Sequence, residues 1–121
     1  MKVAEIVKAI EGEILTPPAV DVDLDRAFAA DLMSDILVFA QPKMLMITGL
    51  TNPQTIRTAE MSDMPVILFV RGKRPSEALV RMAEEIGIGL LLSPYTMYET
   101  CGLLYDAGLP GMGKLPIVQQ S

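Results

Sequence analysis

Polar residues that could bind an anion gather in three short segments, each of which directly follows an apolar run. These segments are Thr48–Asn52, Arg71–Pro75 and Ser93–Thr96. They supply hydroxyls, one amide and three cations, and such donors suit a phosphate or carboxylate, as do the free backbone N–H groups where a helix begins. The candidate ligand-binding residues are Thr48, Gly49, Thr51, Asn52, Arg71, Lys73, Arg74, Ser93 and Thr96.

Each segment also has a purely structural interpretation. Thr51, Asn52 and Thr96 are typical helix N-caps, and Gly49 is typical of a turn with positive φ. The basic residues within 71–74 could form a solvated loop. The chain has neither the glycine-rich phosphate loop that ends in Gly-Lys-Ser/Thr nor a Gly-x-Gly-x-x-Gly run. Motifs therefore favour neither a kinase nor a dinucleotide enzyme.

The composition excludes several kinds of catalytic and metal-binding site. The chain has no histidine, which excludes Ser-His-Asp and Cys-His catalysis and imidazole metal ligands. Cys101 is the single cysteine, and we expect it to pack inside a helix as a small apolar residue. Asp31 and Asp35 are four residues apart and could act as a pair of carboxylates in acid–base catalysis. A role in capping a helix is favoured over this one. We expect no catalytic residue, no metal and no cofactor.

The elements that position the three segments form a repeat of strand, loop and helix. The predicted strands of the repeat are Met44–Thr48, Val66–Val70 and Leu90–Leu92, and its helices are Pro53–Met61, Ser76–Ile86 and Thr96–Ala107. Thr96–Glu99 is typical of a capping box. Because the strands are continuously apolar and crossovers are right-handed, the repeat predicts a three-layer α/β/α sandwich with a mostly parallel sheet.

The N-terminal third is predicted to add further elements to this sandwich. The predicted helices are an amphipathic one at Val3–Ile10 and a short one at Asp35–Ala40, capped by Ser34 or Asp35. The predicted strands are a short one at Glu13–Leu15 and a buried one at Ala27–Ala30, and Val20–Asp25 is predicted to be a half-exposed strand or an extended edge segment. We expect one domain over residues 1–109. Residues 110–121 are expected to form a tail, with an apolar island at 116–118, that is mobile or docked on a partner.

Charge and length narrow the class of partner. The 121 residues carry a net charge of −5, with no basic stripe, so nucleic acid is an unfavourable partner. The N-terminus lacks an apolar signal-peptide core, and no apolar run approaches the ~20 residues that a bilayer span needs. We expect a cytoplasmic protein without a membrane partner.

Several blocks of the sequence closely resemble the DRTGG domain family, in order and spacing. The blocks are Asp31–Leu37, Ile47–Gln54, Arg57–Met61, Phe69–Pro75 and Ser93–Glu99, and the resemblance runs from about Val3 to Leu109. The five-letter motif that names the family is absent, and Gly49–Asn52 takes the corresponding place after a strand.

The resemblance implies an α/β/α fold similar to the N-terminal domain of HPr kinase/phosphorylase and to a domain of phosphate acetyltransferases. It also implies a regulatory, dimeric protein without the phosphate-loop kinase domain. The leading hypothesis is therefore a non-catalytic regulatory homodimer that binds a nucleotide or phosphorylated metabolite at the strand ends. The alternatives are an interaction subunit without a small-molecule site and, less favoured, a small phosphoryl-transfer enzyme.

Overall fold

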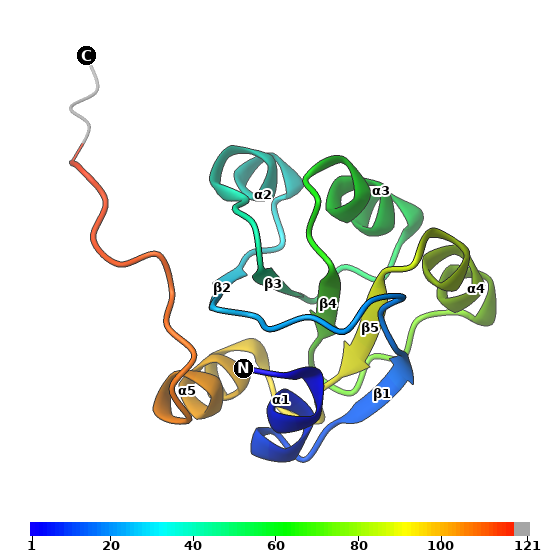
Figure 1. The fold of residues 1–121 in the computed structure, drawn as a ribbon, viewed down its shortest axis with the longest axis horizontal. Helices are drawn as coiled ribbons and strands as arrows, with labels where there is room; N and C mark the ends of the chain where they lie inside the picture. Colours follow the sequence, from blue (N-terminus) through cyan, green and yellow to red (C-terminus); the bar gives the residue numbers. More distant parts are fainter. Residues whose placement is uncertain (118–121) are drawn as a thin grey trace.

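A computed structural model describes residues 1–117 as five helices and five strands (Figure 1). The helices are α1 (Val3–Ala9), α2 (Met33–Phe39), α3 (Pro53–Met61), α4 (Glu77–Ile86) and α5 (Met97–Asp106). The strands are β1 (Glu13–Thr16), β2 (Arg26–Ala29), β3 (Met44–Thr48), β4 (Val66–Phe69) and β5 (Gly89–Leu92). None of the helices in this described part of the chain is long and apolar enough to cross a membrane.

The strands form one sheet in the order β1-β5-β4-β3-β2. Strands β2 to β5 pair in parallel, and β1 pairs with β5 in the antiparallel sense. Helices connect the parallel strands, because a chain that leaves the end of one parallel strand must cross back before the next begins. The predicted mostly parallel sheet is confirmed.

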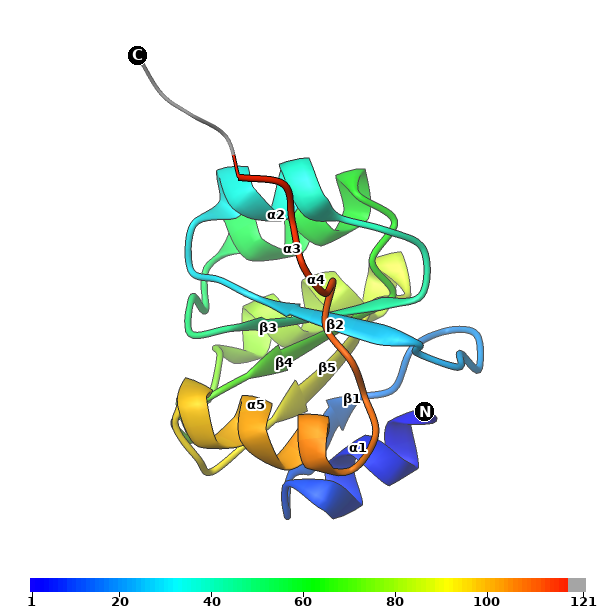
Figure 2. The same ribbon diagram turned by 90° about the vertical axis from the view of Figure 1, so that its left-hand side faces the viewer.

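Helices cover both faces of the sheet, as the predicted three-layer sandwich requires (Figure 2). Helices α2, α3 and α4 lie on one face, while α1 and α5 lie on the other. The sequence of β4 is continuously apolar because its side chains enter the cores on both faces of the sheet. Its Ile67 and Phe69 enter the core beneath α2–α4, and its Val66 and Leu68 enter the core beneath α1 and α5. All four side chains are buried, as expected of a strand covered on both faces.

Local end signals explain where two helices begin and one ends. Asn52 caps α3, since its side chain accepts from the backbone N–H of Thr55 at 3.3 Å. Ser76 caps α4 in the same way, accepting from the N–H of Leu79 at 3.2 Å. Gly87 ends α4 in the left-handed conformation, at φ 93°. The two N-caps satisfy backbone N–H groups in the first turns of α3 and α4, and the glycine ends the helix without strain.

Helix α2 differs from the prediction. It begins at Met33 rather than at Asp35, and Leu32 occupies the N-cap position without a side-chain bond. Neither Ser34 nor Asp35 caps it, because the backbone N–H of Asp35 already donates to the carbonyl of Leu32 at 3.0 Å. The carboxylate of Asp31, one residue earlier, is used elsewhere.

Two further predictions need correction. Of the two alternatives for Val20–Asp25, the strand is wrong, because the segment contributes only an isolated bridge between Asp23 and Lys2. Within this acidic segment, Asp23 pairs with the N-terminal ammonium, which is 22 residues away in the sequence, at 2.6 Å. The capping box predicted at Thr96 is absent, because Thr96 stands at the N-cap of α5 without a side-chain hydrogen bond.

The chain after α5 packs along the open edge of β2 (Figure 2). The carbonyl of Pro110 accepts from the backbone N–H of Ala27 at 2.9 Å, and Met112 packs against the core beneath α2–α4. Beyond it, Leu115 and Ile117 are exposed. The first part of the predicted tail therefore lies on its own domain. Residues 118–121, with the last residue of the predicted apolar island, lie outside the described part.

Candidate functional site

The carboxyl ends of the four parallel strands bring together residues from distant parts of the sequence. Asp31, Gly49, Arg71 and Ser93 follow β2, β3, β4 and β5, respectively, within two residues of each strand end. Because these strands are neighbours and point the same way, the four residues lie along one edge of the sheet. This edge also receives the N-termini of the following helices, where open α/β sheets bind ligands.

The turn after β3 is organised by the carboxylate of Asp31. Its Oδ1 accepts from the Thr48 hydroxyl at 3.0 Å and from the backbone N–H of Gly49 at 2.7 Å. The Thr48 hydroxyl in turn accepts from the N–H of Leu50 at 3.2 Å. Thr48 is fully buried and holds the turn in place, which leaves Asp31 at the surface beside Gly49.

Arg71 stands on the other side of Gly49. A Cβ at Gly49 would lie 3.4 Å from Asp31 Oδ1 and 3.7 Å from Arg71 Nη2. Gly49 is buried, so the carboxylate of Asp31 and the guanidinium of Arg71 both lie within contact range of a methyl group placed at this position. Arg71 is exposed and has a left-handed backbone, at φ 64°, fixed by a hydrogen bond from its N–H to the carbonyl of Tyr95 at 2.7 Å. Within residues 1–117 Arg71 makes no ion pair.

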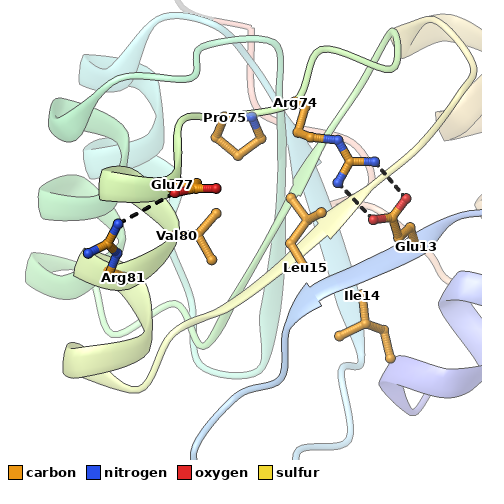
Figure 3. A pocket seen from close by; sticks show the side chains of 8 residues that line it. All are labelled: Glu13, Ile14, Leu15, Arg74, Pro75, Glu77, Val80 and Arg81. Atoms are coloured by element: carbon orange, nitrogen blue, oxygen red, sulfur yellow. Dashed lines mark hydrogen bonds and ion pairs between the residues drawn. The ribbon is translucent and has the colours of Figure 1, made fainter.

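Arg74, three residues after Arg71, has a carboxylate partner of its own. Its guanidinium donates two hydrogen bonds of 2.8 Å to the carboxylate of Glu13 on β1 (Figure 3). This hydrogen bonding lowers the pKa of the Glu13 carboxyl and raises the pKa of the Arg74 guanidinium. The pair lies on a groove of about 400 Å³, whose lining residues are Glu13, Ile14, Leu15, Arg74, Pro75, Glu77, Val80 and Arg81.

A second hollow, of about 310 Å³, shares Glu13 and Arg74 with the first groove. Gly72 from the loop after β4 and Pro94 from the loop after β5 also line it. These loops lead to helices on opposite faces of the sheet, and ligands of open α/β folds often bind at such a place. In this hollow the guanidinium of Arg74 already donates hydrogen bonds to Glu13, and the carboxylate of Glu13 adds a negative charge.

The remaining predicted residues serve mainly structural contacts. Ser93 is buried, shares a 2.8 Å hydrogen bond with the Thr100 hydroxyl and accepts from the N–H of Tyr95 at 3.1 Å. Asn52 acts as the cap of α3. Exposed residues in the predicted set also include Lys73 and Thr96, and Thr51 is half-buried. The structure therefore brings Gly49 and Arg71 together and assigns most of the other side chains to turns and caps.

Sequence reasoning missed two acidic residues at these sites. Asp31 was interpreted as a helix cap, although it stands two residues beyond a strand, the same place that drew attention to Gly49 and Arg71. Glu13 carried no local signal, because its partner Arg74 is distant in the sequence and β1 joins the sheet only through β5. Residues 1–117 contain no group of three side chains that could hold a metal ion.

No protein-family model matches this sequence, and no curated protein matches it. Its fold is similar to a solved structure of the CBS and DRTGG domains from the regulatory region of a Clostridium perfringens pyrophosphatase, complexed with the activator diadenosine tetraphosphate. The TM-score is 0.69 at 14% sequence identity. The match covers 89% of this chain and 47% of the solved chain, so this sequence spans about half of that structure. At this identity the similarity establishes a common α/β fold.

Proposed function

We propose that this chain is a cytoplasmic, non-catalytic regulatory domain that binds a nucleotide or another phosphorylated metabolite at the carboxyl ends of its parallel strands. The observation that carries the proposal is the position of Arg71. Its guanidinium stands beside Gly49 without an ion-pair partner among residues 1–117, at the edge where the N-terminus of α3 also points. A guanidinium and free backbone N–H groups are the donors that phosphate oxygens prefer.

The fold comparison also supports the proposal. The fold neighbour is a regulatory region complexed with a nucleotide activator, which makes a nucleotide a reasonable ligand class to test. The neighbour is not a catalytic domain, in keeping with a regulatory role for this chain.

The experiment compares ligand binding by two matched variants. Arg71→Gly removes the guanidinium and suits the backbone at φ 64°, while Lys43→Gly removes another exposed cation at φ 61° from the opposite end of the sheet. Calorimetric titration with ADP should show binding by the wild type and Lys43→Gly. Binding by Arg71→Gly should be about 10- to 100-fold weaker, since charged hydrogen bonds contribute about 1.5–3 kcal/mol.

A thermal-shift screen of other nucleotides and phosphorylated metabolites widens this test, because a ligand that binds the folded state raises the melting temperature by mass action. If no anion shifts the wild type, or if Arg71→Gly and Lys43→Gly behave alike toward every ligand, the proposal fails.

We also propose that the domain acts as a homodimer, with α5 at the interface. Tyr98 and Tyr105 lie two turns apart on the same helix face and are 88% and 73% exposed. Large exposed aromatic side chains on one face are typical of a protein interface. Light scattering should give twice the monomer mass, and Tyr98→Asp with Tyr105→Asp should return the protein to a monomer. A wild type that is monomeric at every concentration would refute the dimer.

The second candidate function is an interaction subunit without a small-molecule site. Exposed apolar side chains favour it, and they include Leu37 and Val38 of α2 and Leu115 and Ile117 after Met112. This function predicts a large apolar interface with no response to anions. An oligomer whose melting temperature ignores all nucleotides and phosphate esters would favour it over ligand binding.

A further inference from the structure

We infer that two copies of this chain pack their α5 helices against each other around a two-fold axis at Gly102, and that the Tyr98 ring of each copy fills an apolar pocket of the other. The inference rests on the homodimer proposed above, and it adds which residue of the second copy completes which pocket. It comes from one arrangement on α5, where an exposed glycine, two exposed tyrosines and an open pocket are neighbours.

Gly102 lies inside α5, at a position where the domain itself does not require a glycine. Its backbone is helical, and a Cβ there would meet nothing within 4 Å among residues 1–117. Glycine destabilises the interior of a helix relative to alanine, and a close approach by another backbone is one arrangement that needs it. The exposed side of Gly102 is therefore where a second helix can come closest.

The two tyrosines flank Gly102 on the same side of the helix. Tyr98 precedes it by four residues and Tyr105 follows it by three, which is the spacing of neighbours on one helix face. An antiparallel pair of α5 helices that crosses at Gly102 brings four tyrosines together. Because a buried aromatic side chain removes ~150–250 Å² from water, these four supply about half of the ~1,200–2,000 Å² that a standard interface buries.

An apolar pocket of about 190 Å³ opens beside this face of α5. Cys101 and Leu104 of α5 line it, together with Ala29 of β2 and Pro110 of the chain that runs along β2 after the helix (Figure 2). None of the residues that line it is charged. A cavity of ~150 Å³ holds a benzene molecule, so this pocket has room for the ring of a tyrosine.

A two-fold axis at Gly102 places each Tyr98 at the pocket of the other copy. A helix rises ~1.5 Å per residue, so Tyr98 lies about 6 Å along the helix from the axis and stands opposite the partner's Asp106. Long side chains on a helix lean toward its N-terminus, and in an antiparallel pair this direction carries the ring on toward the partner's Leu109. Leu109 lines the pocket. Aromatic side chains that fill a pocket in this way contribute most to many interfaces.

The thiol of Cys101 reports whether a second copy fills the pocket. It lines the pocket and is half-buried in one copy, so an inserted ring covers it further. Sedimentation equilibrium first gives the dissociation constant of the wild-type dimer. The rate at which dithionitrobenzoate modifies Cys101 should then fall about tenfold as the protein concentration rises from well below this constant to about 100 times above it, because the reactive monomer becomes a small fraction by mass action.

Three variants test the named residues. Tyr98→Ser removes the ring, Gly102→Ala adds a methyl group at the crossing point, and Ala29→Val fills part of the pocket. Each should weaken the dimer about tenfold or more, since a contact at the centre of the interface is lost or obstructed. Each should also abolish the protection of Cys101 at concentrations at which the wild type is protected.

Two measurements separate this effect from damage to the fold. Gly102→Ala should weaken the dimer and yet make the subunit more resistant to urea at concentrations at which the wild type is monomeric, because alanine favours the helix. Met61→Ser is the control, since Met61 is 72% exposed, much as Tyr105 is, and lies on α3 on the opposite face of the sheet. It should leave both the dissociation constant and the protection of Cys101 unchanged.

The outcomes separate the inference from the proposed homodimer. If the wild type dimerises and Tyr98→Ser and Gly102→Ala leave its dissociation constant unchanged, the inference is wrong and the dimer forms through other residues. If the wild type dimerises and Cys101 reacts equally fast at every concentration, the ring does not enter the pocket and the inference is again wrong. A wild type that never dimerises refutes the homodimer and the inference with it.

Discussion

Replacing Arg71 by glycine should stabilise the domain, although it removes a residue of the proposed site. Arg71 has φ 64°, and its backbone N–H bond to Tyr95 does not depend on the side chain. A left-handed conformation costs an L-residue about 1–2 kcal/mol. Glycine offsets about 0.4–1 kcal/mol of this gain, because it increases the conformational entropy of the unfolded chain. The net gain is about 0.5–1 kcal/mol, or about 2–5 °C in Tm for a domain of this size.

Urea unfolding at neutral pH, without ligand, measures this gain. Arg71→Ala separates backbone from side chain, because alanine keeps the left-handed strain and should remain within about 0.5 kcal/mol of the wild type. Lys43→Gly is the matched control, with φ 61° at another exposed cation, and should be stabilised by a similar amount. If Arg71→Gly is no more stable than Arg71→Ala, the argument from strain is refuted. If Arg71→Ala is much less stable than the wild type, the guanidinium supports the fold.

Other substitutions test packing and charge elsewhere in the fold. Gly102→Ala should stabilise by about 1 kcal/mol in urea unfolding, because Gly102 is exposed inside α5 and a Cβ there would meet nothing within 4 Å; a loss of stability would contradict this. Gly12→Ala should destabilise by about 1–3 kcal/mol, since its Cβ would stand 2.6 Å from the carbonyl oxygen of Leu92, and wild-type stability would rule out this close approach. The hydrogen bond from Arg74 lowers the folded-state pKa of Glu13, so the pair stabilises at neutral pH and this contribution is lost as the pH falls below about 4.5. Denaturation at a series of pH values should therefore show wild type and Glu13→Gln converging in acid, whereas curves that stay parallel would exclude this role.

Most of the fold was predictable because its signals are local. The continuous apolar runs at β3, β4 and β5 reflect burial on both faces of the sheet, and Asn52, Ser76 and Gly87 mark helix ends through bonds to near neighbours. Two of the errors came from residues with distant partners.

The start of α2 is one such error. It was misplaced because the carboxylate of Asp31, read as part of a capping signal, bonds to Thr48 and Gly49 after another strand. The acidic alternation around Asp23 was interpreted as a strand or an extended edge segment, and the strand is wrong because Asp23 pairs with the chain's own N-terminus. Pairings of this kind have no trace in the neighbouring sequence.

The grouping of the candidate residues in space was predictable only in part. Parallel strands place their carboxyl ends together, which identified the segments around Gly49 and Arg71. The sequence could not show that Arg74, three residues from Arg71, turns away to Glu13 on the edge strand. Side-chain direction in a loop depends on long-range contacts, so a cluster of bases in sequence became two separate sites in space.

The central claim is that a phosphorylated ligand binds beside Arg71 at the carboxyl ends of the parallel strands. The most direct measurement is a titration of the ¹⁵N-labelled protein with AMP, followed by NMR of the backbone amides. The account predicts that the largest shifts fall on the amides of Gly49, Arg71 and their immediate neighbours, and that they vanish in Arg71→Gly. Shifts confined to the groove around Glu13 and Arg74, or no shifts at saturating AMP, would contradict it.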